Sequence, residues 1–185
     1  MKSVFPDTQQ LEYQKGRMYG LCFSLDGISD ALWRIYSPSQ HGVRIKTTAD
    51  HLAKAMSYAP ELTTGRTYIG QVDYLRTNAL KARACDIRKR LVATKDTSAV
   101  AETMLLKRQP FRHEREIRVI HLTSDSGPEQ ELLHFEADPH TVIKSILLDP
   151  RAPDRRVRAL TQHLKKLCGF VGRIAQSETY KVPKL

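Results

Sequence analysis

The sequence has few of the residues that build metal sites, disulfide frameworks or membrane spans. Its three cysteines lie far apart with no Cys-x-x-Cys pair, and its seven histidines show no His-x-x-x-His spacing. A zinc site or a set of disulfides is therefore not expected, and we expect reduced, mostly buried thiols. Apolar runs such as Ser145–Leu148 fall far short of the roughly 20 residues that cross a bilayer.

Motifs of nucleotide binding and secretion are also lacking. Neither a Gly-x-Gly-x-x-Gly fingerprint nor a Walker loop occurs, which sets aside the usual phosphate-binding loops. The first ten residues have no apolar core and therefore do not form a secretory signal. We expect a cytoplasmic protein that does not associate with membranes, with an N-terminal arm at 1–15 and a single domain at 16–182.

Positive charge is abundant: 30 lysines and arginines stand against 20 acidic residues, giving a formal net charge of +10. This excess favours an anionic partner, such as nucleic acid, a nucleotide phosphate or an acidic protein. The cations gather at 81–90 and at 151–166, and in the second segment Val157, Leu160, Leu164 and Leu167 recur at helical spacing. Both clusters fit the solvated faces of helices, or contacts with nucleic-acid phosphates by Arg88, Lys89, Arg90, Arg155 and Arg156.

The order of apolar periods and turns predicts an α+β fold. We expect strands at 19–24, 42–47, 67–74, 112–122, 132–136, 142–148 and 173–180, the first of them buried. We expect helices at 31–36, capped by Ser29 or Asp30, at 50–57, capped by Asp50, at 77–108 in two pieces, and at 153–168. A turn at 124–128 would pair strands 112–122 and 132–136 as a hairpin. This favours a mixed, largely antiparallel sheet flanked by helices over a doubly wound sheet.

The strand at 112–122 carries an unusual row of charges. Side chains alternate between the two faces of a strand, so Glu114, Glu116 and Arg118 are predicted to share one face. Ile117 and Val119 would share the other face and pack. The row is either a reactive or ligand-holding site, or the solvated face of an antiparallel strand.

Three further side chains are candidates for ligand contact. Trp33 and Tyr36 are three residues apart on a predicted helix and would face the same way. They would either pack in the core or form an aromatic wall for a base or a nicotinamide ring. Ser24 ends a strand before a turn, where it could bind a ligand or serve as a structural hydroxyl.

These pieces, in this order, resemble domain-of-unknown-function family 2971, known from bacteria and their mobile elements. The resemblance runs from about residue 19 to 180. It differs from the family pattern in lacking an initial strand of the type Tyr-x-Tyr-Arg or His-Tyr-Thr with its Asn-Asp-Pro turn, and in having Asp149 where glycine is common. The motifs that carry it are Cys22-Phe23-Ser24, Leu32-Trp33-x-x-Tyr36, Gly42-Val43-x-Ile45, Val72-x-Tyr74 and Lys107-x-x-x-Phe111-x-x-Glu114-x-Glu116-x-Arg118.

That family pattern is in turn similar to the ADP-ribosyltransferases, which have a catalytic glutamate on a late strand, often as Glu-x-Glu. The similarity implies an NAD-using enzyme, of a toxin or phage-defence type, or a degenerate relative of one. Glu116 would be the catalytic residue, with Glu114 its partner toward the acceptor. Ser24, Trp33 and Tyr36 would line the NAD pocket, and Arg118 would meet a phosphate or hold Glu116 in place.

Two other functions stay open from the sequence. The first is a nucleic-acid-binding module that uses the two basic segments and has no catalytic activity. The second is a nuclease in which Glu114 and Glu116 hold Mg²⁺, a cation that prefers oxygen ligands, although no Asp-rich motif accompanies them.

Overall fold

A computed structural model describes residues 18–27, 29–94, 97–123 and 131–181. The chain divides into two compact units. Unit 1 comprises Met1–Asp26 and Pro60–His134, and unit 2 comprises Gly27–Ala59 and Phe135–Leu185. Each unit is described by itself, and the single domain expected at 16–182 stays a prediction.

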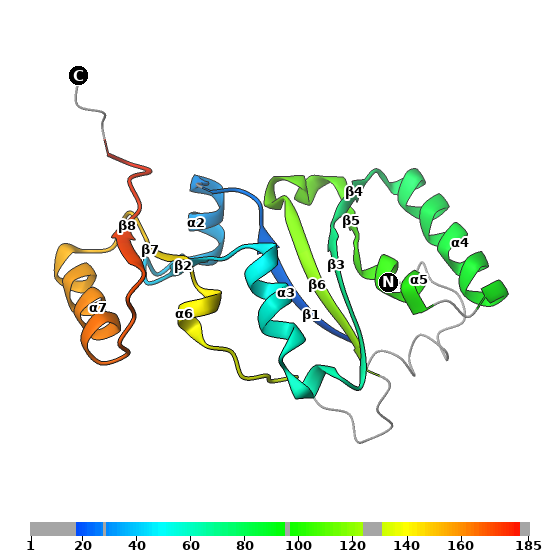
Figure 1. Cartoon of the computed structure of the whole chain (residues 1–185). Coiled ribbons are helices and arrows are strands. Elements are labelled where there is room, and N and C mark those ends of the chain that lie inside the picture. The colour runs from blue at the N-terminus through cyan, green and yellow to red at the C-terminus, as the bar shows by residue number, and fades with distance from the viewer. Residues whose placement is uncertain (1–17, 28, 95–96, 124–130, 182–185) are drawn as a thin grey trace. The chain divides into compact units, whose positions relative to one another are not determined.

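Unit 1 is built on a three-stranded antiparallel sheet with β6 (Glu116–Thr123) in the middle, between β1 (Met18–Ser24) and β3 (Gly65–Gln71) (Figure 1). Two helices, α4 (Thr77–Thr94) and α5 (Thr97–Met104), pack together, and α5 contacts β6. The core includes Ile120 of β6 and Ile87 of α4, both fully buried. Two short strands pair in parallel: β4 (Asp73–Leu75), which follows β3 in the chain, and β5 (Leu106–Arg108), which follows α5. The unit also has two 3₁₀ helices, η1 (Pro60–Leu62) and η2 (Gln109–Glu114).

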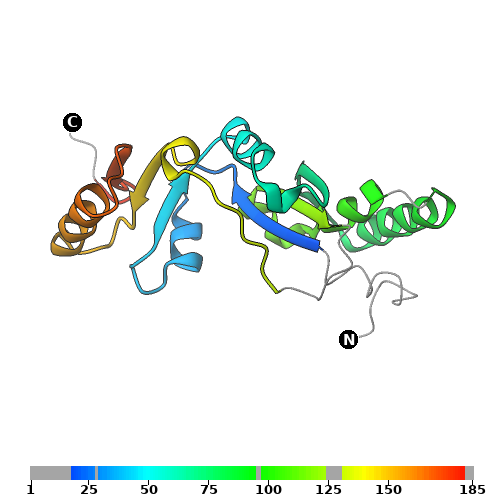
Figure 2. The ribbon, with the colours of Figure 1, turned by 60° about the horizontal axis from the view of Figure 1, so that its bottom comes forward.

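Unit 2 has a sheet of its own, in which β7 (Ser145–Leu148) is antiparallel to β2 (Val43–Lys46) and parallel to β8 (Arg173–Gln176). Its helices are α2 (Asp30–Tyr36), α3 (Ala49–Ser57), α6 (Pro139–Val142) and α7 (Asp154–Lys166). Figure 2 shows α7 beside β8. Ile146, Leu148 and Phe170 form the buried core, and α7 packs on it through Val157, Leu160 and Leu164.

The predicted α+β class is confirmed, since helices and strands intermix and most strand pairs are antiparallel. The amphipathic helix of the second basic segment is also confirmed, except that Leu167 lies past its end and is exposed. The predicted hairpin is wrong: β6 pairs with β1 and β3, and residues 132–136 form no strand. The turn at 124–128 lies outside the described residues.

Burial of the first strand is a second correction. Among the described strands β1 pairs only with β6 and lies at the edge of the sheet, and all seven of its residues are exposed or half-buried. The three thiols, at positions 22, 85 and 168, are exposed as well, contrary to the prediction of buried cysteines. An apolar run of six residues does not reveal whether a strand will find one partner or two.

Element boundaries differ at three places. The strand expected at 67–74 is interrupted at Val72, whose N–H donates to the carbonyl of Glu116 at 3.0 Å before the chain continues as β4. The helical region expected at 77–108 ends at Met104, and the last three residues of the expected range form the strand β5 instead. Helix α3 is capped by Thr48 and not by Asp50, because the Thr48 hydroxyl accepts the N–H of His51 at 3.2 Å.

Of the two expected caps of α2, Ser29 and Asp30, the structure has Ser29, which provides a test of local stability. The Ser29 hydroxyl accepts the N–H of Leu32 at 3.3 Å, at the first turn of a helix only seven residues long. Ser29→Ala is expected to lower the free energy of unfolding by about 1 kcal/mol in urea denaturation. Ser39→Ala, at an exposed serine in the turn after α2, is the control, and an equal loss there would contradict the capping role.

Candidate functional site: a buried carboxylate cluster

The charged row predicted on one strand comes from two elements. The strand begins only at Glu116, because the 3₁₀ helix η2, with Pro110 in its first turn, continues to Glu114. Between them Arg115 adopts the left-handed conformation, with φ of 43°, and turns the chain. The strand expected at 112–122 is therefore wrong over its first four residues, and Glu114 does not reach the site by strand alternation.

The two carboxylates nevertheless meet at one ammonium group. Lys107 of β5 pairs through Nζ with Oε2 of Glu114 and with Oε1 of Glu116. The other oxygen of Glu116, Oε2, accepts from Nε of Arg118 at 2.7 Å. Both glutamates are buried, with 8% and 6% of their surface exposed. We call Lys107, Glu114, Glu116 and Arg118 the carboxylate cluster; its two negative and two positive charges balance.

The backbone around the cluster is fixed by side chains from other strands. The Tyr74 hydroxyl of β4 accepts the N–H of Glu116 at 2.8 Å. The Ser24 hydroxyl donates to the carbonyl of Glu114 at 2.7 Å and also accepts the N–H of Asp26 at 3.1 Å. Ser24 therefore holds the backbone of a predicted site residue, which corresponds to the structural-hydroxyl interpretation of the sequence.

Electrostatics keep Glu116 ionised. Burial raises the pKa of its carboxyl, but hydrogen bonds from Arg118 and Lys107 outweigh burial and lower the pKa to about 2. Burial likewise lowers the pKa of Lys107, and its two carboxylate partners more than compensate and raise it. At neutral pH the site therefore holds a charged Glu116 between a charged lysine and a charged arginine.

The aromatic candidates lie in unit 2 and differ from each other in environment. Trp33 is a core residue, with 8% of its surface exposed, whereas Tyr36 is 68% exposed. They therefore do not present one common aromatic face, although both belong to α2. Their part in NAD binding stays a prediction.

The basic candidates fall on two helices with different surroundings. On α4, Arg90 pairs with Glu102 of α5, while Arg88 and Lys89 are exposed. On α7, Arg155 and Arg156 are exposed and line an open groove in unit 2. Neither group belongs to the carboxylate cluster.

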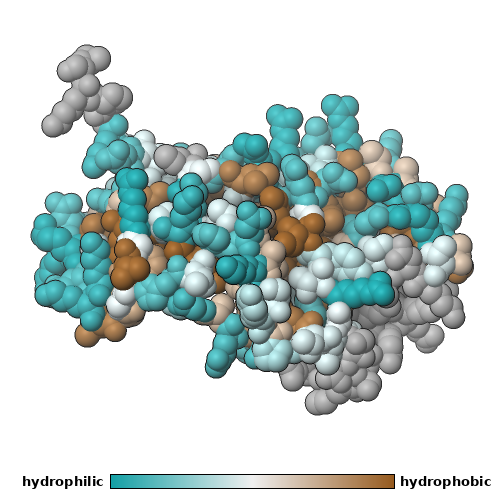
Figure 3. All heavy atoms as spheres, viewed as in Figure 1, coloured by the Kyte–Doolittle hydropathy of each residue, from teal (hydrophilic) through white to brown (hydrophobic). Residues whose placement is uncertain are grey.

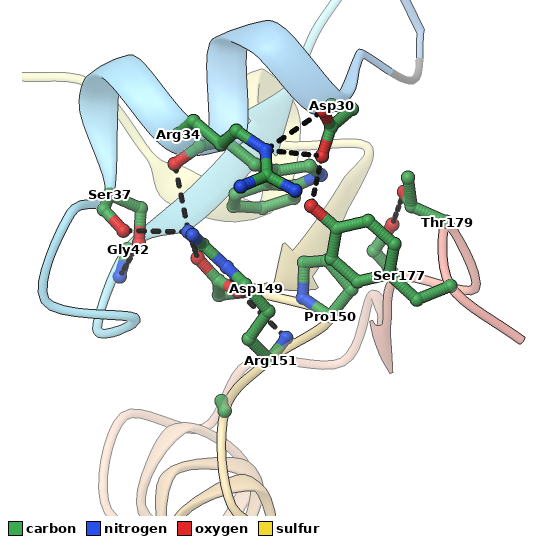
Figure 4. Close-up of polar contacts among 12 residues, drawn as sticks. Asp30, Arg34, Ser37, Gly42, Asp149, Pro150, Arg151, Ser177 and Thr179 are labelled. Carbon is green, nitrogen blue, oxygen red and sulfur yellow. Dashed lines mark hydrogen bonds and ion pairs between the residues drawn. The ribbon is translucent and has the colours of Figure 1, made fainter.

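Sequence reasoning missed a second charge pair, in unit 2, whose carboxylate is buried (Figure 4). Asp149 follows β7, is fully buried, and accepts the backbone N–H of Arg151 at 2.8 Å and its Nη2 at 2.8 Å. The same Nη2 donates to the carbonyls of Trp33 and Ser37, at 3.0 and 2.7 Å, so the pair joins the end of α2 to the end of β7. Burial raises the pKa of Asp149, but hydrogen bonds from Arg151 and Ser37 lower it to about 2.

The sequence held a signal for the missed members of the first site but none for the second. Lys107 and Tyr74 stand in the motifs that carry the family resemblance, although no role followed for them. Asp149 was noted only as a departure from glycine. The carbonyls to which its partner Arg151 donates, those of Trp33 and Ser37, are more than a hundred residues away, a separation that no local pattern spans.

Two further findings concern metals and membranes. Among the residues that the structure describes, no group of three or more His, Cys, Asp or Glu side chains could hold a metal ion. The position between Glu114 and Glu116 is occupied by the Lys107 ammonium group. Within the described ranges, no helix combines the length and the apolar composition that a bilayer span requires.

Comparison with known proteins supports the family resemblance over the middle of the chain. Residues 32–119 match the model of a family described as "Protein of unknown function (DUF2971)". The match covers just under half of the 185 residues, from α2 to the centre of β6, and includes the whole carboxylate cluster. Searches of curated proteins and of solved structures gave no match.

Proposed function

We propose that this chain is an NAD-using enzyme of the ADP-ribosyltransferase type, in which Glu116 is the catalytic residue. The observation that supports the proposal is the state of Glu116. It is a buried carboxylate, ionised at neutral pH, at the first position of a central strand and two residues after a second buried glutamate. Glu114 and Glu116 also form the Glu-x-Glu pattern that is often found in the ADP-ribosyltransferases.

The chemistry requires a fixed negative charge. Breaking the bond between nicotinamide and ribose builds positive charge on the sugar, and a preorganised carboxylate beside the sugar stabilises that charge. Glu116 would supply this carboxylate. Glu114 would orient the acceptor and take its proton as the new glycosidic bond forms.

The cations of the cluster have a part in this proposal. Lys107 and Arg118 occupy both oxygens of Glu116, so one of them must move before the carboxylate can face a sugar. The pyrophosphate of NAD carries two negative charges and would compete with Glu116 for these cations. Binding of NAD would thus exchange a lysine–carboxylate pair for a lysine–phosphate pair and expose Glu116 to the ribose.

NAD is expected to raise the melting temperature of the protein at millimolar concentration, and the protein is expected to release nicotinamide from NAD. Glu116→Gln should lower the rate of nicotinamide release by about 100-fold or more, because it removes the charge that stabilises the transition state. Glu61→Gln, at an exposed glutamate of η1 in the same unit, is the matched control and should keep the activity.

Two outcomes would contradict the proposal: no change in melting temperature with millimolar NAD, or equal nicotinamide release by the wild type and Glu116→Gln. Circular dichroism establishes whether the variant folds. If it does not, Glu116→Asp keeps the charge but withdraws it by one methylene group, and should still bind NAD while releasing nicotinamide more slowly. A nuclease with Mg²⁺ between the two glutamates is less well supported, because Lys107 occupies that position.

A further inference from the structure

A groove on α7 is independent of the carboxylate cluster. It is open, with a volume of about 710 Å³, and all its lining residues belong to unit 2. Arg155, Ala159 and His163 follow one another at intervals of four residues, and so do Arg156 and Leu160, so these side chains form one stripe on the helix. Leu160 and Ala159 belong to the apolar part of the lining, which we call the floor, and the other lining residues include cations and imidazole rings.

Within the described residues, the exposed cations of α7 have no acidic partner, unlike Arg83 and Arg90 of α4. On α4, Arg83 and Arg90 both pair with Glu102 and with Asp86. On α7, Asp154 is the one acidic residue, and within the described residues no side-chain ion pair or hydrogen bond engages the exposed cations Arg155, Arg156, Arg158, Lys165 and Lys166. In Figure 3, hydrophilic residues gather over α7 at the left of the view, beside a smaller hydrophobic patch. Among the residues that the structure describes, no acidic side chain therefore neutralises the charge of this face.

The combination of cations and an apolar floor selects the class of ligand. Arginine forks pair with phosphate oxygens in a bidentate manner. Bases stack on rings and pack on apolar side chains only where they are not stacked inside a duplex. An acidic peptide would match the charge but would leave the floor and the imidazoles of His41 and His163 without a flat partner.

We infer that the α7 groove binds single-stranded nucleic acid, with phosphates on Arg155 and Arg156 and an unpaired base against Leu160. The helix has 13 residues and is therefore about 20 Å long, which accommodates a few nucleotides. The inference does not depend on the proposed NAD chemistry, since the groove and the cluster share no residue.

The test is the fluorescence anisotropy of a labelled oligothymidylate, titrated with the full chain at several salt concentrations. The wild type should bind at low salt, and the logarithm of its binding constant should decrease linearly with the logarithm of the salt concentration. Arg155→Gln/Arg156→Gln should lose about tenfold or more in affinity, and its salt slope should fall by about 1.4, since each lost phosphate contact on a single strand accounts for about 0.7. The matched control, Arg88→Gln/Lys89→Gln, removes the same charge from exposed positions of α4 and should stay close to wild type.

Other ligands separate the classes of partner. A duplex of the same length and a polyglutamate peptide should bind less tightly than the single strand, because neither offers an unpaired base. Binding of either one as tight as that of the single strand, with the same sensitivity to Arg155→Gln/Arg156→Gln, would overturn the inference. So would equal weakening by the α4 control, or the absence of binding at low salt. Glu116→Gln should bind the oligonucleotide like the wild type, so this inference and the proposed enzyme activity can fail separately.

Discussion

Lys107→Met is expected to lower the free energy of unfolding by about 3 to 5 kcal/mol, as measured by urea denaturation at neutral pH. Lys107 is the shared partner of two buried carboxylates. Methionine fills much of the same space but carries no charge, so the cluster would be left with two negative charges and one positive charge. A buried charge without a partner is among the most destabilising features that a single substitution creates.

Two companion variants separate charge from packing. Lys89→Met, at an exposed position of α4, should change stability by less than about 0.5 kcal/mol. The double variant Lys107→Met/Glu114→Gln restores one negative charge to one positive charge, Glu116 with Arg118, and should recover much of the loss. If the double variant is no more stable than Lys107→Met alone, then lost packing and not charge imbalance explains the effect.

The same cluster gives the wild type a defined response to acid. The folded pKa of Glu116, about 2, lies below its ordinary value of 4.5. A carboxyl whose pKa is lowered by folding stabilises the protein above the ordinary value, and this stability is lost as the pH falls toward the folded value. The urea concentration at the midpoint of unfolding should therefore decrease as the pH is lowered from about 4.5 to about 2, the range set by these two pKa values.

The site also shows how far strand periodicity can be used on this chain. The alternation argument is correct for Glu116 and Arg118, which lie on one strand and contact each other at 2.7 Å. It is wrong for Glu114, because Pro110 and the left-handed Arg115 replace the expected strand by a 3₁₀ turn. Glu114 joins the site because Lys107 reaches both carboxylates, and that contact depends on β5, a strand that was expected to be helix.

Local signals predicted local structure, and pairing between distant segments escaped them. The Ser29 cap and the apolar stripe of α7 depend on neighbours within four residues, so the sequence contains all the information that they need. Strand partners are set by packing across the whole chain. A turn-like segment at 124–128 therefore indicated a hairpin, although β6 pairs with β1, about a hundred residues earlier.

Asp149→Ala is expected to lower the free energy of unfolding by about 1.5 to 3 kcal/mol, the range for hydrogen bonds to a charged group. The Asp149 carboxylate has none of its surface exposed and accepts three hydrogen bonds from Arg151, at 2.8, 3.0 and 2.8 Å. Without it, the guanidinium loses its counter-charge beside the ends of α2 and β7. Asp50→Ala, at an exposed position of α3, is the control and should change stability by less than about 0.5 kcal/mol.

Acid should distinguish the variant from the wild type. Folding lowers the pKa of Asp149 from 3.8 to about 2, so the wild type loses this contribution as the pH falls between those values. Asp149→Ala has no such group, and its stability should therefore fall less steeply over the same range. Equal slopes for the two proteins would contradict the assignment of this pair as a source of acid sensitivity.

A second substitution measures what Arg151 contributes apart from its ion pair. In Asp149→Ala/Arg151→Met both charges of the pair are absent, so no guanidinium is left without its counter-charge and part of the stability should return. Recovery should be incomplete, because the carbonyls of Trp33 and Ser37 also lose their donor. Full recovery would mean that these two hydrogen bonds add nothing to the free energy of unfolding, and that Arg151 stabilises the fold only through its ion pair with Asp149.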